Sequence, residues 1–533
     1  MAGPERERGK FYEKAIHMIF ESPLPPVDLT NLSVTERLFQ GLEARADKTV
    51  MIDALNGETV TGAALMDRIQ RLAGGLTANG QGAGTVTALM APNCIDWVTA
   101  FHGVAYAGGT VTTVNPGYTT AELNRQLIDS GATMLVTTPE FLETAQAGAA
   151  QTDVSQIVVI GGAPGVTSLE AMMGEPLPSQ AAIDPAETVV AMPYSSGTTG
   201  LPKGVCLTHR NLVVNVDQCI AAMPTPQPGD TTVAVLPFFH MFGLTVLANV
   251  TLARQGCLVT LPRFDLARFL ELIQEHRVPI VYVVPPIIVA LAKHPLVAEY
   301  DLSCLDIVGS GAAALGEEVA QAVTDRLGCA VIQGWGMTEV TTTGSCQFLH
   351  NNRPGTIGVA VPNTEIRIVD TETCTDLPVD TPGELWIRGP HVMKGYLNRP
   401  DDTAKTLTSD GWLRTGDIVS IDADGYLTMH DRLKEIIKVN GFQVAPAEIE
   451  AVLLSHPEIA DAGVVGRPDN EAGERPVAHV VLAAGASIDE EAIKAFVLER
   501  LTRYKTPSDV HFVETIPKSP SGKILRRLLR ETV

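Results

Sequence analysis

The stretch Tyr194-Ser-Ser-Gly-Thr-Thr-Gly-Leu-Pro-Lys-Gly-Val205 is the densest chemical feature of the sequence, and the patterns on both sides of it indicate the fold. Its hydroxyl side chains are potential hydrogen-bond donors, and they belong to Ser195, Ser196, Thr198 and Thr199. Gly197 and Gly200 allow the backbone to turn sharply and to point its N–H groups inward. Lys203 adds a mobile positive charge. This combination predicts a loop that binds a polyphosphate, although a Ser/Gly-rich surface turn has a similar composition.

The residues that flank this loop predict a β-hairpin rather than a Walker A loop. A Walker A loop needs a lysine followed at once by Ser or Thr and then by a helix. Here Pro202 precedes the lysine, and residues 203–208 have the apolar pattern of a strand. A second run with strand character, residues 187–192, leads into the loop. We therefore expect two strands that close over phosphate groups.

The loop resembles the AMP-binding signature of the adenylate-forming superfamily, which comprises acyl-CoA synthetases, adenylation domains and beetle luciferases. Further motifs follow in that family's order, and they are Gly334-Trp-Gly-Met-Thr-Glu339, Gly383-Glu-Leu-Trp-Ile-Arg-Gly389, Gly411-Trp-Leu-Arg-Thr-Gly-Asp417, Asp431-Arg-Leu-Lys-Glu-Ile-Ile-Lys438, Gly441-Phe-Gln-Val-Ala-Pro446 and Pro517-Lys-Ser-Pro-Ser-Gly-Lys523. The resemblance extends over nearly the whole chain and looks closest to 4-coumarate–CoA ligases. It implies an acid–thiol ligase that uses ATP, Mg²⁺ and coenzyme A.

Composition sets the class of protein. A chain of 533 residues is too long for one simple core and predicts two or more domains. Its net charge of −22 argues against an extended nucleic-acid surface. The cysteines lack metal-binding spacing, and the N-terminal residues lack the apolar core of a signal peptide. The most apolar region, residues 278–292, is broken by prolines. We expect a cytoplasmic protein without stable membrane anchoring, either a monomer or a homodimer.

Alternating β and α patterns predict the α/β class, with doubly wound βα sheets in a large N-terminal domain that also has a β-rich subdomain. The composition changes near Asp431, after which a compact α+β pattern follows. We therefore place the domains at residues 1–431 and 432–533, with a hinge near Lys434 and a mobile second domain. The run Gly309-Ser-Gly-Ala-Ala-Ala314 matches a dinucleotide fingerprint, but the next strand lacks the acidic residue that holds a ribose. A tight turn that lines the ligand pocket is favoured there.

The resemblance assigns nucleotide-binding roles to the central motifs. Trp335 stacks on adenine beside Gln333 and Gly334, although a lone tryptophan is also typical of a core. Thr338 and Glu339 position the α-phosphate and Mg²⁺, and a carboxylate suits that hard cation. Asp417 accepts from the ribose hydroxyls, or forms an Asx turn instead. Arg432 supplies a further ribose contact.

The resemblance divides the two half-reactions between two faces of the second domain. Lys523, which otherwise belongs to a basic tail, is the adenylation lysine that contacts the α-phosphate and the substrate carboxylate. Lys438, Gly441 and Gln443 lie on the opposite face and serve thioester formation. Two catalytic faces on one domain imply a rotation with Lys434 at the hinge. Arg263 matches a basic residue that meets a phosphate of coenzyme A.

The acyl pocket is the part whose specificity stays open. The resemblance lines it with His240, Phe242, Gly309, Ala312, Gln333, Gly334 and Cys346, and His240 gates it, although a lone histidine is often structural. Phe242 stands where plant coumarate ligases have tyrosine, Gly309 where some relatives have lysine, and Asn440 where they have lysine. We expect an aryl (cinnamate- or 4-coumarate-like) or medium-chain carboxylic acid. A stand-alone adenylation enzyme that loads a carrier protein and a luciferase-like monooxygenase are the alternatives.

Overall fold

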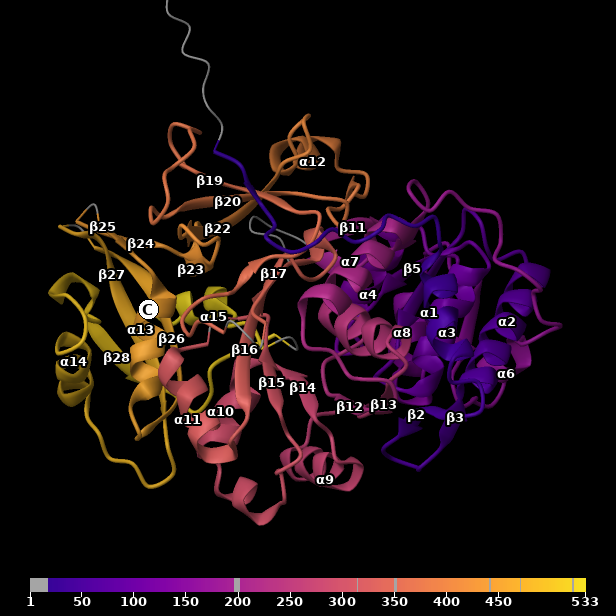
Figure 1. Cartoon of the computed structure of the whole chain (residues 1–533), viewed down its shortest axis with the longest axis horizontal. Coiled ribbons are helices and arrows are strands. Elements are labelled where there is room, and N and C mark those ends of the chain that lie inside the picture. The colour runs from indigo at the N-terminus through magenta and orange to yellow at the C-terminus, as the bar shows by residue number, and fades with distance from the viewer. Residues whose placement is uncertain are drawn as a thin grey trace, which may run out of the picture.

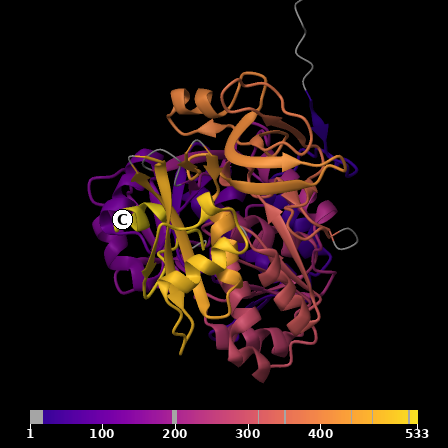
Figure 2. The same cartoon turned by 90° about the vertical axis from the view of Figure 1, so that its left-hand side faces the viewer.

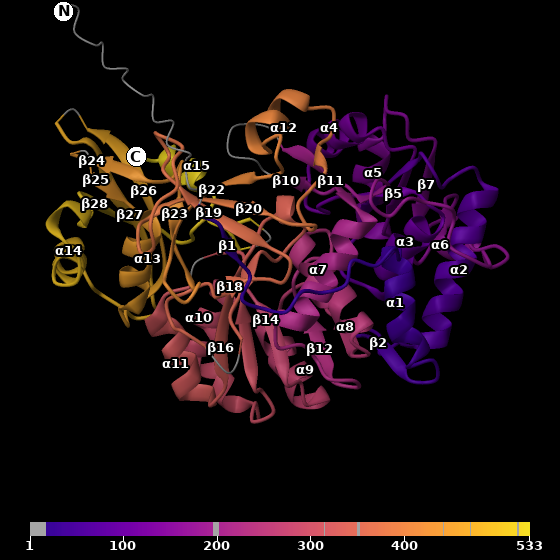
Figure 3. The same cartoon turned by 45° about the horizontal axis from the view of Figure 1, so that its top comes forward.

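The computed structural model describes residues 18–195, 202–313, 315–348, 352–440, 442–469, 471–519 and 522–533. Figure 1 shows two parts side by side. The large part holds the sheets formed by residues up to about 432, and the small part, in yellow, holds the C-terminal sheet and helices. Helix α2 (Gly62–Ala78) and helix α14 (Glu490–Leu498) lie at opposite ends of the molecule (Figures 1 and 3).

The first sheet of the large part is mainly parallel and is covered by helices on both faces. In strand β4 (Val86–Met90), Leu89 packs in one buried cluster, while its neighbours Ala88 and Met90 pack in another. Helices α3 (Ile95–Tyr106) and α4 (Thr120–Ser130) contribute to these two clusters respectively. The alternation of side chains along a strand explains why both faces are apolar. In sheet order the strands are β10 (Tyr194–Ser195), β11 (Lys203–Thr208), β9 (Val189–Ala191), β5 (Thr110–Thr113), β4 (Val86–Met90), β6 (Met134–Thr137), β7 (Gln156–Val159) and β8 (Thr167–Ser168).

Two further sheets with parallel strands complete the α/β layers, and one of them positions the site. Its parallel strands are β14 (Ile280–Val283), β15 (Ile307–Ser310) and β16 (Ala330–Trp335), and antiparallel β17 (Ser345–Cys346) and β18 (Val359–Ala360) extend it. The other sheet contains β12 (Thr231–Ala234), β13 (Cys257–Thr260), β2 (Thr49–Asp53) and β3 (Thr59–Thr61).

The remaining helices of the large part surround these sheets. They are α1 (Val34–Glu43), α5 (Leu142–Gly148), α6 (Leu169–Met172), α7 (His209–Ala222), α8 (Thr251–Ala253), α9 (Leu266–His276), α10 (Pro285–Lys293), α11 (Glu317–Leu327) and α12 (Pro400–Thr406). Short 3₁₀ helices occur at η1 (Pro139–Phe141), η3 (Pro295–Glu299) and η4 (Thr338–Val340), and η2 (Phe242–Val250) is a π-helix.

An antiparallel sheet lies above these layers in Figure 1 and forms the expected β-rich subdomain. Its strands are β1 (Phe20–Glu21), β19 (Glu365–Val369), β20 (Gly383–Arg388), β22 (Leu413–Ile421) and β23 (Leu427–Arg432). The short strand β21 (Gly395–Tyr396) pairs with β11 of the hairpin instead.

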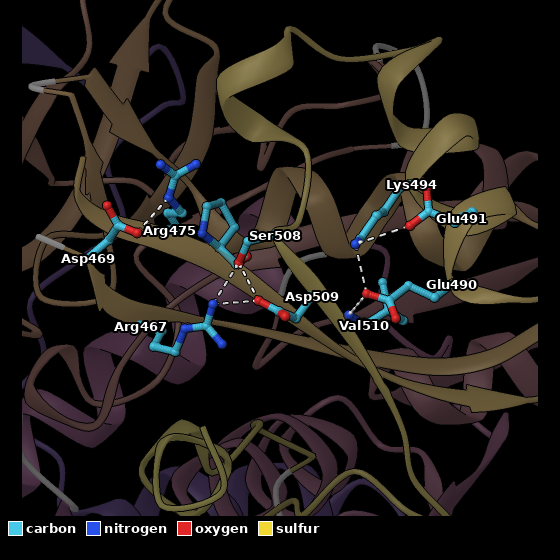
Figure 4. Close-up of polar contacts among 10 residues, drawn as sticks. Arg467, Asp469, Arg475, Glu490, Glu491, Lys494, Ser508, Asp509 and Val510 are labelled. Carbon is cyan, nitrogen blue, oxygen red and sulfur yellow. Dashed lines mark hydrogen bonds and ion pairs between the residues drawn. The ribbon is translucent and has the colours of Figure 1, made fainter. Parts of the chain in front are cut away.

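The C-terminal part has a hydrophobic core of its own. Its sheet contains β24 (Ile437–Val439), β25 (Phe442–Val444), β26 (Ile459–Asp469), β27 (Gly473–Leu482) and β28 (Asp509–Phe512), with helices α13 (Pro446–Ser455), α14 and α15 (Arg526–Arg530), and 3₁₀ helix η6 (Arg503–Lys505). Buried residues from Ile437 to Val510 form one cluster. Ion pairs on the surface of this part include Arg475–Asp469 and Lys494–Glu490 (Figure 4). Figure 2 shows this part in front of the rest of the chain.

The expected fold class is confirmed, and local expectations are confirmed or corrected. Strands β10 and β11 form the expected hairpin, with Ser195 opposite Lys203, and its tip lies outside the described residues. Gly309 and Ser310 belong to strand β15, so the turn starts only at Gly311. The strand expected at 187–192 is limited to β9. Within the described ranges, no helix combines the length and the apolarity that crossing a bilayer requires.

Candidate active site

A pocket opens at the carboxyl ends of strands β15 and β16, the edge at which open α/β sheets bind ligands. All seven residues expected to line the acyl pocket lie on it, together with Trp335 and Thr338, and Lys523 reaches it from the C-terminal part. The lining residues are Met223, His240, Met241, Phe242, Tyr282, Gly309, Ser310, Gly311, Ala312, Ile332, Gln333, Gly334, Trp335, Gly336, Met337, Thr338, Thr342, Thr343, Cys346 and Lys523. The structure therefore brings residues of the Gly334–Glu339 motif and Lys523, from the last motif of the series, into one cavity.

Lys523 lies on a hairpin whose two sides are hydrogen-bonded to each other. The Ser519 amide donates to the Lys523 carbonyl at 2.8 Å, and Lys518 pairs with Ile524 across the hairpin. Part of the Lys523 side chain is accessible to solvent, yet protein atoms crowd its ammonium. This desolvation, together with the charge of Arg432, lowers the pKa of Lys523 to about 8, against the opposing influence of Asp417 and Glu339.

Trp335 and Asp417 are joined at the edge of the pocket. The indole Nε1–H of Trp335 donates to Asp417 Oδ2 at 2.8 Å, and Arg432 Nε lies 3.4 Å from Asp417 Oδ1. The Asp417 carboxylate is buried, and it stands opposite Arg432 in the register of β22 and β23. Trp335 also lines the pocket. Because its hydrogen bond to Asp417 uses only the edge of the indole, the face of the ring is available for contact with a ligand.

Glu339 has a partner that the sequence analysis missed. The Tyr396 hydroxyl donates to Glu339 Oε1 at 2.9 Å, and Glu339 is only 3% exposed. Burial, and then the Glu339 charge, raise the pKa of Tyr396, so the phenol stays a neutral donor. Thr338 and Glu339 share the short helix η4, while Tyr396 comes from β21, which pairs with the hairpin strand β11. No sequence pattern predicts this contact, because it depends on the pairing of Gly395-Tyr396 with that hairpin in the folded chain.

The donor set around Glu339 fits Mg²⁺ held jointly with phosphates. Among the described residues, no group of three or more His, Cys, Asp or Glu side chains is arranged to hold a metal ion by itself. A single buried carboxylate suits Mg²⁺, which commonly takes one or two carboxylates and completes its shell with phosphate and water. Glu339 is therefore the residue that would hold this ion beside the phosphates.

Lys203 is held in place beside the same network. Its ammonium lies 2.9 Å from Asp402 Oδ2 and 5.1 Å from the centre of the Tyr396 ring. Asp402 belongs to helix α12 and was also not anticipated. The expected phosphate ligands Ser196, Gly197, Thr198 and Thr199 lie outside the described residues.

Two aromatic rings fill the far end of the pocket because glycines make room for them. A Cβ atom on Gly309 would lie 2.3 Å from Cδ1 of Tyr282, and one on Gly311 would lie 2.6 Å from Cε1 of Phe242. The two rings meet edge to face with centroids 6.5 Å apart. The Tyr282 hydroxyl is already bonded to the Pro224 carbonyl. Tyr282 thus occupies the space above Gly309, which sequence reasoning had treated only as a missing lysine.

Few polar side-chain atoms remain for a ligand at this apolar end. The Thr342 hydroxyl donates to the Met241 carbonyl at 3.0 Å, and Thr343 Oγ1 accepts from Cys219 at 3.4 Å. Ser310 Oγ is buried and has no hydrogen-bond partner among the described residues. Cys346 is buried as well, and burial raises the pKa of its thiol.

His240 is a neutral group at the junction of the polar and apolar ends. Its Nδ1 accepts from the Phe242 amide at 3.4 Å. Burial, followed by the positive charge of Lys523, lowers the pKa of His240 to about 3. The segment that follows is the π-helix η2, a rare geometry that often marks functional sites. Ala312 (φ 72°) and Thr341 (φ 65°) are also held in the left-handed region near the pocket.

The residues expected to serve thioester formation do not line this pocket. Lys438 and Gln443 are exposed on β24 and β25, and Gly441 lies outside the described residues. Lys434 follows β23 at the junction of the two parts, where burial lowers its pKa. Arg263 is exposed between β13 and α9 and is paired with Glu140.

Comparisons with known proteins agree with this geometry. Residues 38–397 match the model of the family described as "AMP-binding enzyme", and residues 448–523 match "AMP-binding enzyme C-terminal domain". The chain is 41% identical over 525 residues to 4-coumarate–CoA ligase 5 of Oryza sativa subsp. japonica, which covers 96% of this chain and 97% of the relative.

Two solved structures have the same architecture. The anthranilate CoA ligase AuaEII in complex with anthranoyl-AMP is 26% identical with a TM-score of 0.88, over 95% of this chain and 98% of that one. ATP-bound MatB from Rhodopseudomonas palustris is 30% identical with a TM-score of 0.87, over 94% and 99%. Because the family models together span most of both parts of the chain, this protein belongs to the AMP-binding, or adenylate-forming, enzyme family.

Proposed function

We propose that the protein is an acid–thiol ligase that converts a carboxylic acid to its CoA thioester through an acyl-adenylate. The observation that carries the proposal is the entry of Lys523, from the C-terminal part, into the pocket formed by Thr338, Trp335 and His240. The full-length similarity to a 4-coumarate–CoA ligase supports the choice of a thiol acceptor.

In the first half-reaction the carboxylate oxygen forms a bond to the α-phosphorus of ATP, and the bond to the leaving pyrophosphate breaks. Negative charge that develops on the phosphoryl oxygens needs fixed positive charge or donors nearby. Lys523 supplies the charge, and Thr338 supplies a hydroxyl beside it. Mg²⁺ at Glu339 would neutralise phosphate charge, while Tyr396 holds that carboxylate in place.

The nucleoside and the outer phosphates are bound by separate parts of the site. Asp417 accepts from the ribose hydroxyls with the lone pairs that Trp335 and Arg432 leave free, and the Trp335 ring packs on adenine beside Gln333 and Gly334. The hairpin at Ser195 and Lys203 closes over the outer phosphates, which replace Asp402 as the partner of Lys203.

In the second half-reaction the CoA thiolate attacks the acyl carbon and AMP leaves. We infer that residues 432–533 rotate about Lys434, which removes Lys523 and brings Lys438, Gly441 and Gln443 to the pocket. The separate hydrophobic core of this part supports movement as a unit. Arg263, released from Glu140, binds a phosphate of coenzyme A, and the neutral His240 gates the passage between thiol and acyl group.

The acid is proposed to be an aryl acid of cinnamate type or a medium-chain aliphatic acid. Phe242 and Tyr282 give the far end of the pocket apolar walls. Ala312 and Cys346 beside them offer no side-chain group that forms a strong hydrogen bond with a phenol hydroxyl. The carboxylate end faces Lys523 and His240. This polarity orients the acid for attack.

The division of labour predicts opposite effects of two lysine substitutions. Lys523→Ala should lower acid-dependent pyrophosphate release by roughly two or more orders of magnitude, because one preorganised charge is lost at a developing anion. It should leave thioester formation from supplied acyl-adenylate intact. Lys438→Ala should spare the first burst of pyrophosphate and slow capture by CoA. Equal losses of both half-reactions in either variant would contradict the assignment of the two faces.

The lowered pKa of Lys523 predicts the pH dependence of adenylation. The ammonium form is the active one, so kcat/KM for adenylate formation should fall as pH rises through about 8, by up to about tenfold for each further unit. Bound ATP, as an anion, should move the corresponding fall in kcat to higher pH. Lys523→Arg serves as the control because guanidinium stays charged. A decline of the same shape in that variant would assign the titration to another group.

The apolar end of the pocket predicts the order of substrates. A para-hydroxyl buried there without a partner costs roughly 1–3 kcal/mol, or about ten- to a hundredfold in specificity. Cinnamate and octanoate should therefore have kcat/KM values at least equal to that of 4-coumarate. Tyr282→Ala should shift preference toward bulkier acids, whereas Tyr282→Phe, which keeps the ring, should not. A tenfold preference of the native enzyme for 4-coumarate over both other acids would overturn this assignment.

A further inference from the structure

Both ends of helix α10 in the large part contact the C-terminal part. At its start, the N-cap residue Val284 meets Gly522 of the Lys523 hairpin, where an added Cβ would lie 3.1 Å from Val284 Cβ. At its end, Lys293 reaches helix α13. Helices α10 and α13 lie close together in Figures 1 and 3. One helix of the large part therefore touches both the Lys523 hairpin and the helix at the base of the small part.

The Lys293 ammonium donates hydrogen bonds to three backbone carbonyls of the C-terminal part. Its Nζ donates to the Leu454 carbonyl at 2.9 Å, to that of Ile459 at 3.0 Å and to that of His456 at 3.4 Å. The last carbonyls of an α-helix have no partner within the helix and carry the negative end of its dipole. The carbonyls of Leu454 and of the C-cap residue His456 belong to this helix end, while that of Ile459 begins strand β26, so the three donors of the ammonium bind the helix end and the strand that follows it.

The surface around this contact is also packed. Leu454 of α13 packs against the core cluster of the large part. On the neighbouring helix, an added Cβ on Gly316, the N-cap of α11, would lie 3.3 Å from Cβ of Ala451. Helix α13 thus packs on α10 and α11, and Lys293 holds the C-terminal end of α13 in place on these two helices.

Helix α13 is coupled rigidly to the Lys523 hairpin within the C-terminal part. Arg526 binds both oxygens of the buried Glu450 on α13, at 2.8 and 2.7 Å. Lys518, at the base of the hairpin, binds both oxygens of Asp461 on β26, at 2.8 and 2.7 Å. Breaking the buried Glu450–Arg526 pair is costly, so the segment that follows the hairpin stays bound to α13 when the part moves.

We propose that Lys293 is a positioning residue for adenylation: by binding the end of α13, it holds the C-terminal part in the orientation that places Lys523 in the pocket. It does not touch the reacting groups itself. Rotation for thioester formation must break its three hydrogen bonds, so Lys293 favours the first half-reaction over the second. This inference rests on the proposed function.

Lys293→Met tests the proposal because methionine keeps the apolar stem and removes the donors. First-turnover pyrophosphate release should fall at least about fivefold, since charged hydrogen bonds are lost. Thioester formation from supplied acyl-adenylate and CoA should stay unchanged or accelerate. Lys293→Arg, which keeps charge and donors, should restore part of the rate. The matched control is Lys494→Met on α14, whose ammonium pairs only with Glu490 and Glu491 in the described structure (Figure 4).

Hydrogen exchange gives a readout that does not depend on catalysis. In the free enzyme, Lys293→Met should speed amide exchange in the segment 515–525, which contains the Lys523 hairpin, while Lys494→Met should not. Unchanged half-reactions and exchange in Lys293→Met would overturn the proposal, and so would an equal fall of both half-reactions, which marks a merely structural role. If the native enzyme releases no pyrophosphate with any acid, the proposed function fails, and the exchange comparison still decides the role of Lys293.

Discussion

The structure depends on one constraint: a loop of the C-terminal part has to place the Lys523 ammonium in a crowded pocket of the large part. Desolvation and the nearby charge of Arg432 disfavour the cation, while Asp417 and Glu339 favour it. An anion that binds in this pocket stabilises the ammonium form of Lys523, because the phosphate charge compensates for the hydration that burial removes. The electrostatics thus couple occupation of the pocket by a nucleotide to the presence of Lys523.

The same constraint explains how the C-terminal part is built. It has a core separate from that of the large part, and Glu450–Arg526 and Asp461–Lys518 tie its hairpin to that core. Its contact with the large part includes the hydrogen bonds from Lys293 to backbone carbonyls. Ion pairs that hold the C-terminal part together would let it turn as one body in the rotation proposed above.

The β/α alternation and the hairpin were predictable from the sequence because local pattern and turn chemistry determine them. Motif resemblance also assigned Lys523, Glu339, Asp417 and Trp335 to parts of one nucleotide, and in the structure Lys523 and Trp335 line one pocket while Trp335 binds Asp417. The missed residues share one property: each acts through a contact between distant segments. Tyr396 reaches Glu339 only because β21 pairs with β11, and Tyr282 fills the space above Gly309 only because β14 and β15 are adjacent. The carbonyls that Lys293 binds are backbone atoms, so no side-chain pattern marks them.

If the pocket activates a carboxylate by adenylation, ATP is cleaved at its α-phosphorus. Phosphorus NMR of the native enzyme with ATP, Mg²⁺ and cinnamate or octanoate, without CoA, distinguishes cleavage at the α-phosphorus from cleavage at the γ-phosphorus. The account predicts enzyme-bound acyl-AMP and free pyrophosphate in amounts near that of the enzyme, only when an acid is present. Formation of ADP and inorganic phosphate, or pyrophosphate release that does not depend on the acid, would contradict it.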